Sequence, residues 1–280
     1  MLLKLISVAS LVSSALAVTS SIRWNPLGTT QLSGIAVNVD SVVGIAPTNS
    51  EVVIVSKSNG QAVRTGKTGI VSVRTFGSGS LAKIWAVDTQ GKASFCSLST
   101  PCTNPSDWIP MASVPDGLAF VEGGPTGKLY GIDKNGKYWL CDSSECREGT
   151  SSWTLKSPGP FKKIFSGFMK LFGVAAGGYE GTMRNDRRLL VNSGPGFGFS
   201  NNDDLVSWFD ASKIDRDFAM IGNTRTLWIW NDGRGWSNAT SSNMQNIMRN
   251  LVSVALESRS KIFATDTSNT LYKGDIVYAE

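Results

Sequence analysis

Histidine is absent from this chain of 280 residues. Its absence excludes the Ser-His-Asp triad, the Cys-His pair and histidine-rich zinc sites, and it removes the commonest general base. Paired carboxylates, as glycosidases use them, are the catalytic chemistry that stays open. We expect a protein that is not an enzyme and that carries no cofactor.

Charged residues and long apolar runs are also scarce. Asp, Glu, Lys and Arg make up 18% of the chain, whereas glycine is frequent, with 29 copies. Few charges together with many glycines favour a protein of strands and turns. No run beyond the N-terminus approaches the ~18 apolar residues of a membrane span. We therefore expect no membrane span.

The first 17 residues have the pattern of a secretory signal peptide. Lys4 supplies the basic region, an apolar stretch follows, and Ala15-Leu16-Ala17 is a cleavage signal. A buried N-terminal helix is the alternative. We expect residues 18–280 to form one secreted, extracellular domain, with Asn238 in Asn-Ala-Thr as a glycosylation acceptor.

Four cysteines lie in two short loops, CSLSTPC and CDSSEC. In an oxidising compartment an even count indicates disulfides. Three pairings are possible, and the local pairing, Cys96 with Cys102 and Cys141 with Cys146, is favoured because each pair shares one loop. A zinc site is the alternative, disfavoured because the chain lacks histidine and C-x₂-C spacing.

One eight-residue pattern recurs along the chain. Its copies are VVGIAPTN, IWAVDTQG, LYGIDKNG, LFGVAAGG, LWIWNDGR and IFATDTSN, and they start at 42, 84, 129, 171, 227 and 262. The starts are separated by 42, 45, 42, 56 and 35 residues. Self-similarity at this period is typical of propellers and solenoids.

Each copy predicts a β-hairpin. A run of apolar, β-prone residues is followed by Asp and, three residues later, by Gly or Asn at a position that needs positive φ. Asn49 and Asn269 are expected to take that conformation where Gly is missing. An inner strand is expected upstream of each hairpin, the fifth at FAMIG (218–222), and further upstream a Trp strand carrying Trp24, Trp108, Trp153 or Trp208.

These elements predict an all-β fold, a six-bladed β-propeller of four-stranded antiparallel blades. Along the chain, the first expected strand is the Trp strand at 21–24 and the last is a hairpin strand at 270–279. Pairing of these N- and C-terminal strands would close the ring and hide two sheet edges.

The pattern of an upstream Trp, a Gly-led apolar strand and an aromatic-Gly-Ile-Asp-x-x-Gly hairpin resembles the tectonin repeat. Its clearest copy runs from Trp108 to Trp139. The resemblance implies a six-bladed propeller lectin that binds glycans or bacterial surface saccharides at several sites, in the manner of an innate-immunity protein. The irregular fourth-to-fifth spacing and the disulfide loops depart from the plain repeat and leave the number of sites open.

Aromatic and acidic side chains near loops are the candidate carbohydrate-binding residues. The candidates are Trp108, Trp139, Trp153, Trp236, Asp88 and Asp133. Recurrence by repeat also favours a purely structural role, with each Trp packing the blade and each Asp forming its turn. No metal site is expected.

Positive charge gathers between residues 151 and 190, where seven basic residues stand against two acidic ones, an excess of +5. The candidate patch for anionic ligands comprises Lys156, Lys162, Lys163, Arg184, Arg187 and Arg188. Such a patch favours acidic or phosphorylated glycans over nucleic acid in a secreted protein. A solvated face, a propeller that binds a protein partner, and a carboxylate-dependent glycan hydrolase are the alternatives.

Overall fold

The computed structural model describes residues 20–77, 81–123, 127–157, 161–167, 179–184, 189–190, 208–214, 217–222, 225–231 and 235–278. The predicted signal peptide, residues 1–17, lies outside them. The described chain is almost entirely β-strand, which confirms the all-β prediction. Its helical elements are a 3-10 turn at Pro105–Asp107 and one short helix, α2 (Gln245–Met248).

Three four-stranded antiparallel sheets follow one another along the first part of the chain. The first is β2 (Ser33–Val37), β3 (Ser41–Ile45), β4 (Val52–Ser56) and β5 (Ala62–Arg64). The second is β6 (Ile70–Phe76), β7 (Lys83–Asp88), β8 (Ala93–Ser97) and β9 (Ile109–Pro110). The third is β10 (Leu118–Gly123), β11 (Leu129–Asp133), β12 (Tyr138–Cys141) and β13 (Thr154–Ser157).

The second part of the chain forms two further sheets. One is β14 (Phe161–Gly167), β15 (Tyr179–Arg184) and β16 (Leu189–Leu190). The other has eight strands in the order β17 (Trp208–Ile214), β18 (Asp217–Gly222), β19 (Leu227–Asn231), β20 (Gly235–Ser241), β1 (Ser20–Gln31), β23 (Thr270–Tyr278), β22 (Lys261–Asp266) and β21 (Leu251–Ser258).

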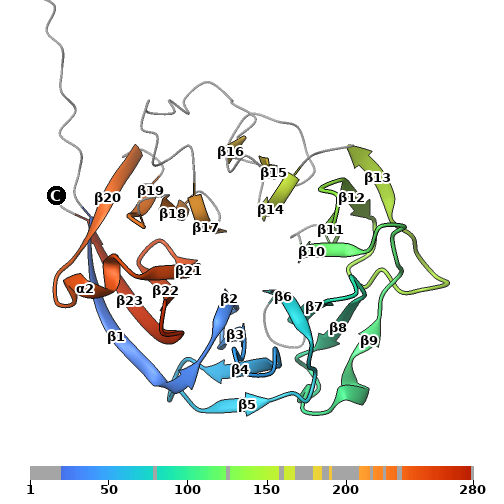
Figure 1. Ribbon diagram of the computed structural model, residues 1–280, viewed down its shortest axis with the longest axis horizontal. Coiled ribbons are helices and arrows are strands. Elements are labelled where there is room, and N and C mark those ends of the chain that lie inside the picture. Colours follow the sequence, from blue (N-terminus) through green and yellow to red (C-terminus); the bar gives the residue numbers. More distant parts are fainter. Residues whose placement is uncertain are drawn as a thin grey trace, which may run out of the picture.

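The sheets are arranged radially, and the strands nearest the centre are β2, β6, β10, β14, β17 and β21 (Figure 1). These inner strands contact one another in succession: β2 touches β21 and β6, β10 touches β6 and β14, and β17 touches β14 and β21. Buried residues such as Leu118 fill the space between the second and third sheets. Similar clusters join the first sheet to the second and to the eight-stranded sheet.

Strand β1 joins the two ends of the described chain. It pairs antiparallel with β23, placing Trp24 opposite Gly274, which confirms the predicted pairing of the terminal strands. Its other edge pairs in parallel with β20, from Ser20 opposite Ala239 to Ile22 opposite Ser241. Both edges of β1 are thus hydrogen-bonded, and β1 joins strands β17–β20 to strands β21–β23 in the eight-stranded sheet.

The recurring turn residue has a second role, because its carbonyl reaches the next sheet. Gly91 takes φ +84° and its carbonyl accepts the amide of Leu118, the first residue of β10. Asn269, at φ 64°, accepts the amide of Leu32 in the same way. In the first copy Ser50 takes the positive φ and accepts from Ile70, so the prediction for Asn49 was wrong by one residue.

The fifth copy of the repeat lies one strand earlier than predicted. FAMIG (218–222) belongs to β18, the second strand of its sheet, and Trp208 begins the inner strand β17. Arg225 takes φ 63° and its amide bonds to the Gly222 carbonyl at 3.0 Å, as the amide of Gly91 bonds to Asp88 at 2.9 Å.

The fourth copy, predicted at 171–178, lies outside the described residues, and the second strand of its sheet, β15, begins at Tyr179 opposite Gly167. The corresponding strand starts at 129, 179 and 217 are separated by 50 and 38 residues, so the spacing is uneven in this part of the chain. The fifth copy was missed at this place because Gly222 stands in the Asp position and Arg225 in the Gly position. The turn residues that identified other copies are therefore absent from it.

Candidate functional site

The aspartates of the hairpins hold their own turns. The Asp133 side chain is 1% exposed; its Oδ1 accepts the amides of Asn135 and Lys137, and its Oδ2 accepts Trp139 Nε1, each at 2.9 Å. Asp88 Oδ1 likewise accepts the amides of Gln90 and Lys92 at 2.9 Å. Both side chains therefore stabilise their turns, which is the structural role that their recurrence in the repeat also indicated. Asp133 has no exposed surface left for a saccharide.

Two of the four candidate tryptophans belong to the core. Trp108 and Trp153 are buried, and Trp153 Nε1 donates to the Ala112 carbonyl at 2.8 Å. A Cβ on Gly131 would lie 3.1 Å from the Trp153 ring, so the small third residue of the hairpin pattern makes room for the Trp of the outer strand. The geometry of these rings is that of blade packing.

The other two tryptophans differ from these. Trp139 is half-buried and bonded to Asp133, while Trp236 lies in β20 with a side chain outside the described residues. Asn238 is exposed on the same strand, as an acceptor for a glycan requires.

The candidate basic patch falls largely outside the described residues. Lys156 is exposed at the outer strand β13. Lys162, Lys163 and Arg184 are described in their backbone alone, within β14 and β15, and Arg187 and Arg188 are not described. The patch stays a prediction.

The cysteines pair as predicted. Disulfides join Cys96 to Cys102 and Cys141 to Cys146, which confirms the local connectivity. Within the described ranges, no cluster of Cys, Asp and Glu could hold a metal ion, and no helix is of a length and apolarity to cross a membrane.

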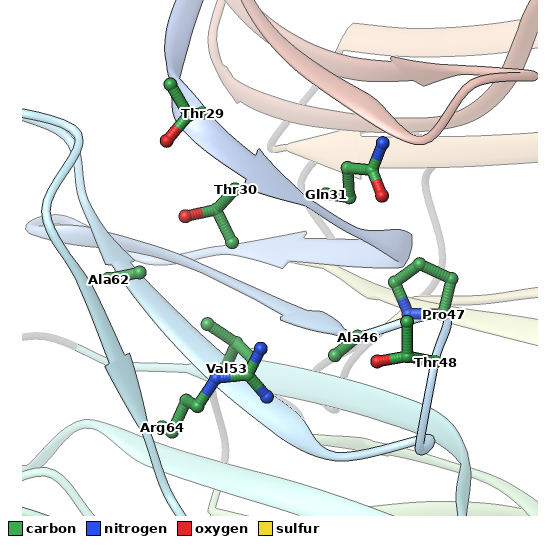
Figure 2. A pocket seen from close by; sticks show the side chains of 9 residues that line it. All are labelled: Thr29, Thr30, Gln31, Ala46, Pro47, Thr48, Val53, Ala62 and Arg64. Carbon is green, nitrogen blue, oxygen red and sulfur yellow. The ribbon is translucent and has the colours of Figure 1, made fainter.

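A polar pocket of about 440 Å³ opens between β1 and the β2–β5 sheet (Figure 2). Three parts of the chain between residues 29 and 64 line it. They are Thr29, Thr30 and Gln31 from β1; Ala46, Pro47 and Thr48 from the β3–β4 turn; and Val53, Ala62 and Arg64 from β4 and β5. Polar groups and a smaller apolar surface thus face one space.

A bulge in β1 creates this pocket. The pairing register with β23 jumps from Pro26 opposite Tyr272 to Gln31 opposite Thr270, so the residues between leave the ladder. Gly28, at φ +71°, permits the detour, since a Cβ there would lie 2.6 Å from the Gly60 carbonyl oxygen. The bulge carries Thr29 and Thr30 toward the neighbouring sheet.

Arg64 and Glu51 form an ion pair at the wall of the pocket. Arg64 Nη1 donates to Glu51 Oε2 at 2.7 Å, while Glu51 Oε1 accepts the Gly66 amide at 2.8 Å. Burial opposes ionisation of Glu51, but the hydrogen bonds from Gly66, Asn49 and Arg64 outweigh it and hold the pKa of Glu51 below its ordinary value.

The lowered pKa of Glu51 makes the fold sensitive to acid. A carboxyl with a depressed folded-state pKa contributes stability above its unfolded pKa, about 4.3, and that contribution is lost as pH falls through the folded pKa. Thermal unfolding followed from neutral pH to below pH ~4 should show a falling melting temperature. The Glu51→Gln variant should show a shallower fall; an equal slope would contradict the prediction.

Sequence analysis predicted none of the pocket residues. Its candidates were aromatic and acidic, whereas the pocket is lined by threonines, Gln31 and Arg64. One signal was present: Pro26 and Gly28 interrupt the Trp strand, as residues at a bulge do. The partner segments could not be found this way, because their proximity depends on how two sheets pack.

No family model and no curated protein matches the chain. Solved structures do. A protein of unknown function from Bacteroides thetaiotaomicron has a TM-score of 0.60 at 10% identity, covering 92% of this chain and 76% of its own. The β-propeller domain of Cps50 (Swd1) from Myceliophteria thermophila has a TM-score of 0.55 at 11% identity, covering 90% and 98%. The chain has a β-propeller fold.

YCF48, solved with a bound D1 peptide, gives a TM-score of 0.52 at 10% identity, covering 90% of this chain and 96% of its own. Identities this low establish the fold of this propeller and nothing about its ligand. Its function has to be argued from its own site.

Proposed function

We propose that this chain is a secreted six-bladed β-propeller, closed by the pairing of β1 with β23, that binds a saccharide and catalyses no reaction. The recurrence of the hairpin pattern and the succession of contacts among the six inner strands β2, β6, β10, β14, β17 and β21 support the blade count. The two disulfides suit an extracellular compartment. The likeness to tectonin repeats belongs to this proposal and rests on the same recurrence.

The observation that carries the proposal is the pocket between β1 and the β2–β5 blade. Thr29, Thr30, Gln31 and Thr48 bring hydroxyl and carboxamide groups that none of the hydrogen bonds among the described side chains engages. Sugar hydroxyls both donate and accept, which suits this set of groups. The pocket's 440 Å³ lies within the range of small-molecule sites, about 300–1,000 Å³.

The apolar part of the lining completes the match to a sugar. Pro47 and Ala62 are exposed and offer carbon surface on which the C–H face of a pyranose ring could pack. Figure 2 shows the Pro47 ring and the polar side chains of Gln31 and Thr48 in the same part of the pocket. A mono- or disaccharide unit is the ligand that uses both kinds of surface.

Binding to a glycan array, followed by titration calorimetry with the best ligands, tests the proposal. Gln31→Ala should weaken binding about threefold to tenfold, because it removes one or two hydrogen bonds of about 0.5–1.5 kcal/mol each. Gln90→Ala is the matched control, since Gln90 is exposed at the β7–β8 turn, away from the pocket. Equal affinities for both variants, or no bound glycan, would contradict the proposal.

A protein or peptide partner is the second candidate, favoured by β5. This strand ends its sheet in the pairing order, its three residues are exposed, and Val63 is 42% exposed. An extended peptide could add a strand at such an edge. Binding that free sugar does not compete away, and that Val63→Pro abolishes, would favour this candidate.

A further inference from the structure

The positive charge that Arg64 brings to the pocket is balanced by the carboxylate of Glu51. Arg64 is the charged residue of the lining, and its side chain is 62% exposed. One of its nitrogens bonds to Glu51, whose side chain is 7% exposed. Figure 2 shows the Arg64 guanidinium pointing from β5 toward the other lining side chains. A ligand in the pocket therefore meets the guanidinium with its counter-charge directly behind it.

Glu51 cannot follow or leave Arg64 easily. Its Oε1 is tied to the Gly66 amide at 2.8 Å, and its Oε2 also accepts Asn49 Nδ2 at 3.1 Å. Pulling the arginine away would strand a buried carboxylate without its partner, which is strongly unfavourable. The pair therefore behaves as one fixed unit of zero net charge.

A fixed neutral pair distinguishes between two kinds of saccharide. A carboxylate, sulfate or phosphate beside Arg64 would gain from the guanidinium and lose to Glu51, 2.7 Å behind it. Neighbouring sugar hydroxyls pay no such penalty. They can accept from the remaining N–H groups, since a guanidinium has five and the structure engages one with Glu51.

We infer that this pocket, if it binds a saccharide as proposed above, selects uncharged sugars and holds a pair of adjacent hydroxyls on Arg64, with Glu51 as the residue that fixes and neutralises the arginine. This ligand class differs from the acidic glycans that the basic residues between 151 and 190 suggest. The two regions lie in different blades, so they would read different chemistry.

The test compares a neutral oligosaccharide with its uronic-acid counterpart, the same chain carrying carboxylates, by calorimetry at low and high salt. The wild-type protein should bind the neutral form at least about tenfold more tightly, with an affinity that salt leaves unchanged. Glu51→Gln, which keeps a carbonyl oxygen for the Gly66 amide, should gain affinity for the acidic form, and that gain should disappear at high salt.

Arg64→Met should weaken binding of the neutral form about tenfold, and Arg147→Met is its matched control, because Arg147 is 47% exposed and paired with Glu145 at 2.6 Å in another blade. Equal or tighter salt-dependent binding of the acidic form by the wild-type protein would overturn this inference and leave the proposed function intact. Binding of neither form would overturn both. The wild-type comparison decides even if Glu51→Gln does not fold.

Discussion

Replacement of Trp24 by alanine is expected to lower the free energy of unfolding by about 3–5 kcal/mol, as for other fully buried aromatic side chains. Trp24 is 0% exposed. Its ring lies edge-on to Tyr272 at 6.5 Å between centroids and packs where Gly274 leaves room. The change opens a cavity in the strand pair that joins the two ends of the described chain, so it weakens the pairing of β1 with β23.

Urea denaturation followed by far-UV circular dichroism measures the effect. Trp139→Ala is the control, since Trp139 is half-buried and lies within a single blade. Trp139→Ala should lower the free energy of unfolding less than Trp24→Ala does, with the same dependence of that free energy on urea concentration. If Trp24→Ala costs less than about 1 kcal/mol, β1 does not hold the fold together.

Replacement of Asp133 by alanine is expected to lower the free energy of unfolding by about 2–3 kcal/mol, because it leaves three partly buried donors without their acceptor. The donors are the amides of Asn135 and Lys137 and the indole nitrogen of Trp139. Glycan binding should be unchanged at temperatures where the variant is folded, since the carboxylate is committed to the turn.

Asp88→Ala is the matched control for this second change. Asp88 stands at the same place in its repeat but is partly exposed, and its carboxylate accepts the amides of Gln90 and Lys92. Asp88→Ala should lower the free energy of unfolding by about 1 kcal/mol. A stable Asp133→Ala protein that no longer binds glycan would assign Asp133 to a ligand site and refute the structural role.

Hairpins could be predicted wherever the turn chemistry was explicit. Asp133 and Gly136 announce a turn, and the structure has one there. The fifth hairpin escaped because Gly222 and Arg225 adopt the same turn without its usual residues. Arg225 takes the left-handed conformation, and its Nη1 donates to the Leu251 carbonyl in β21 at 3.0 Å. A local pattern does not contain that support.

The roles of the tryptophans could not be predicted from the sequence as well as the turns could. Periodicity located Trp108 and Trp153 but could not decide whether each ring faces a ligand or a neighbouring strand. That choice depends on the residue opposite: Trp153 lies against Gly131, whose missing side chain admits the ring. Cross-strand register is a tertiary fact, since it is set by which strands pair and where each ladder begins.

The sequence alone determined the recurring hairpin of this protein, its local disulfides, and the pairing of its first and last strands. Each of these is encoded by residues close together or by the order of the repeat. The tertiary structure alone decided the pocket. Residues 29–31, 46–48 and 62–64 come together because β1 bulges away from β23 toward the next blade, and no local preference of those segments records that approach.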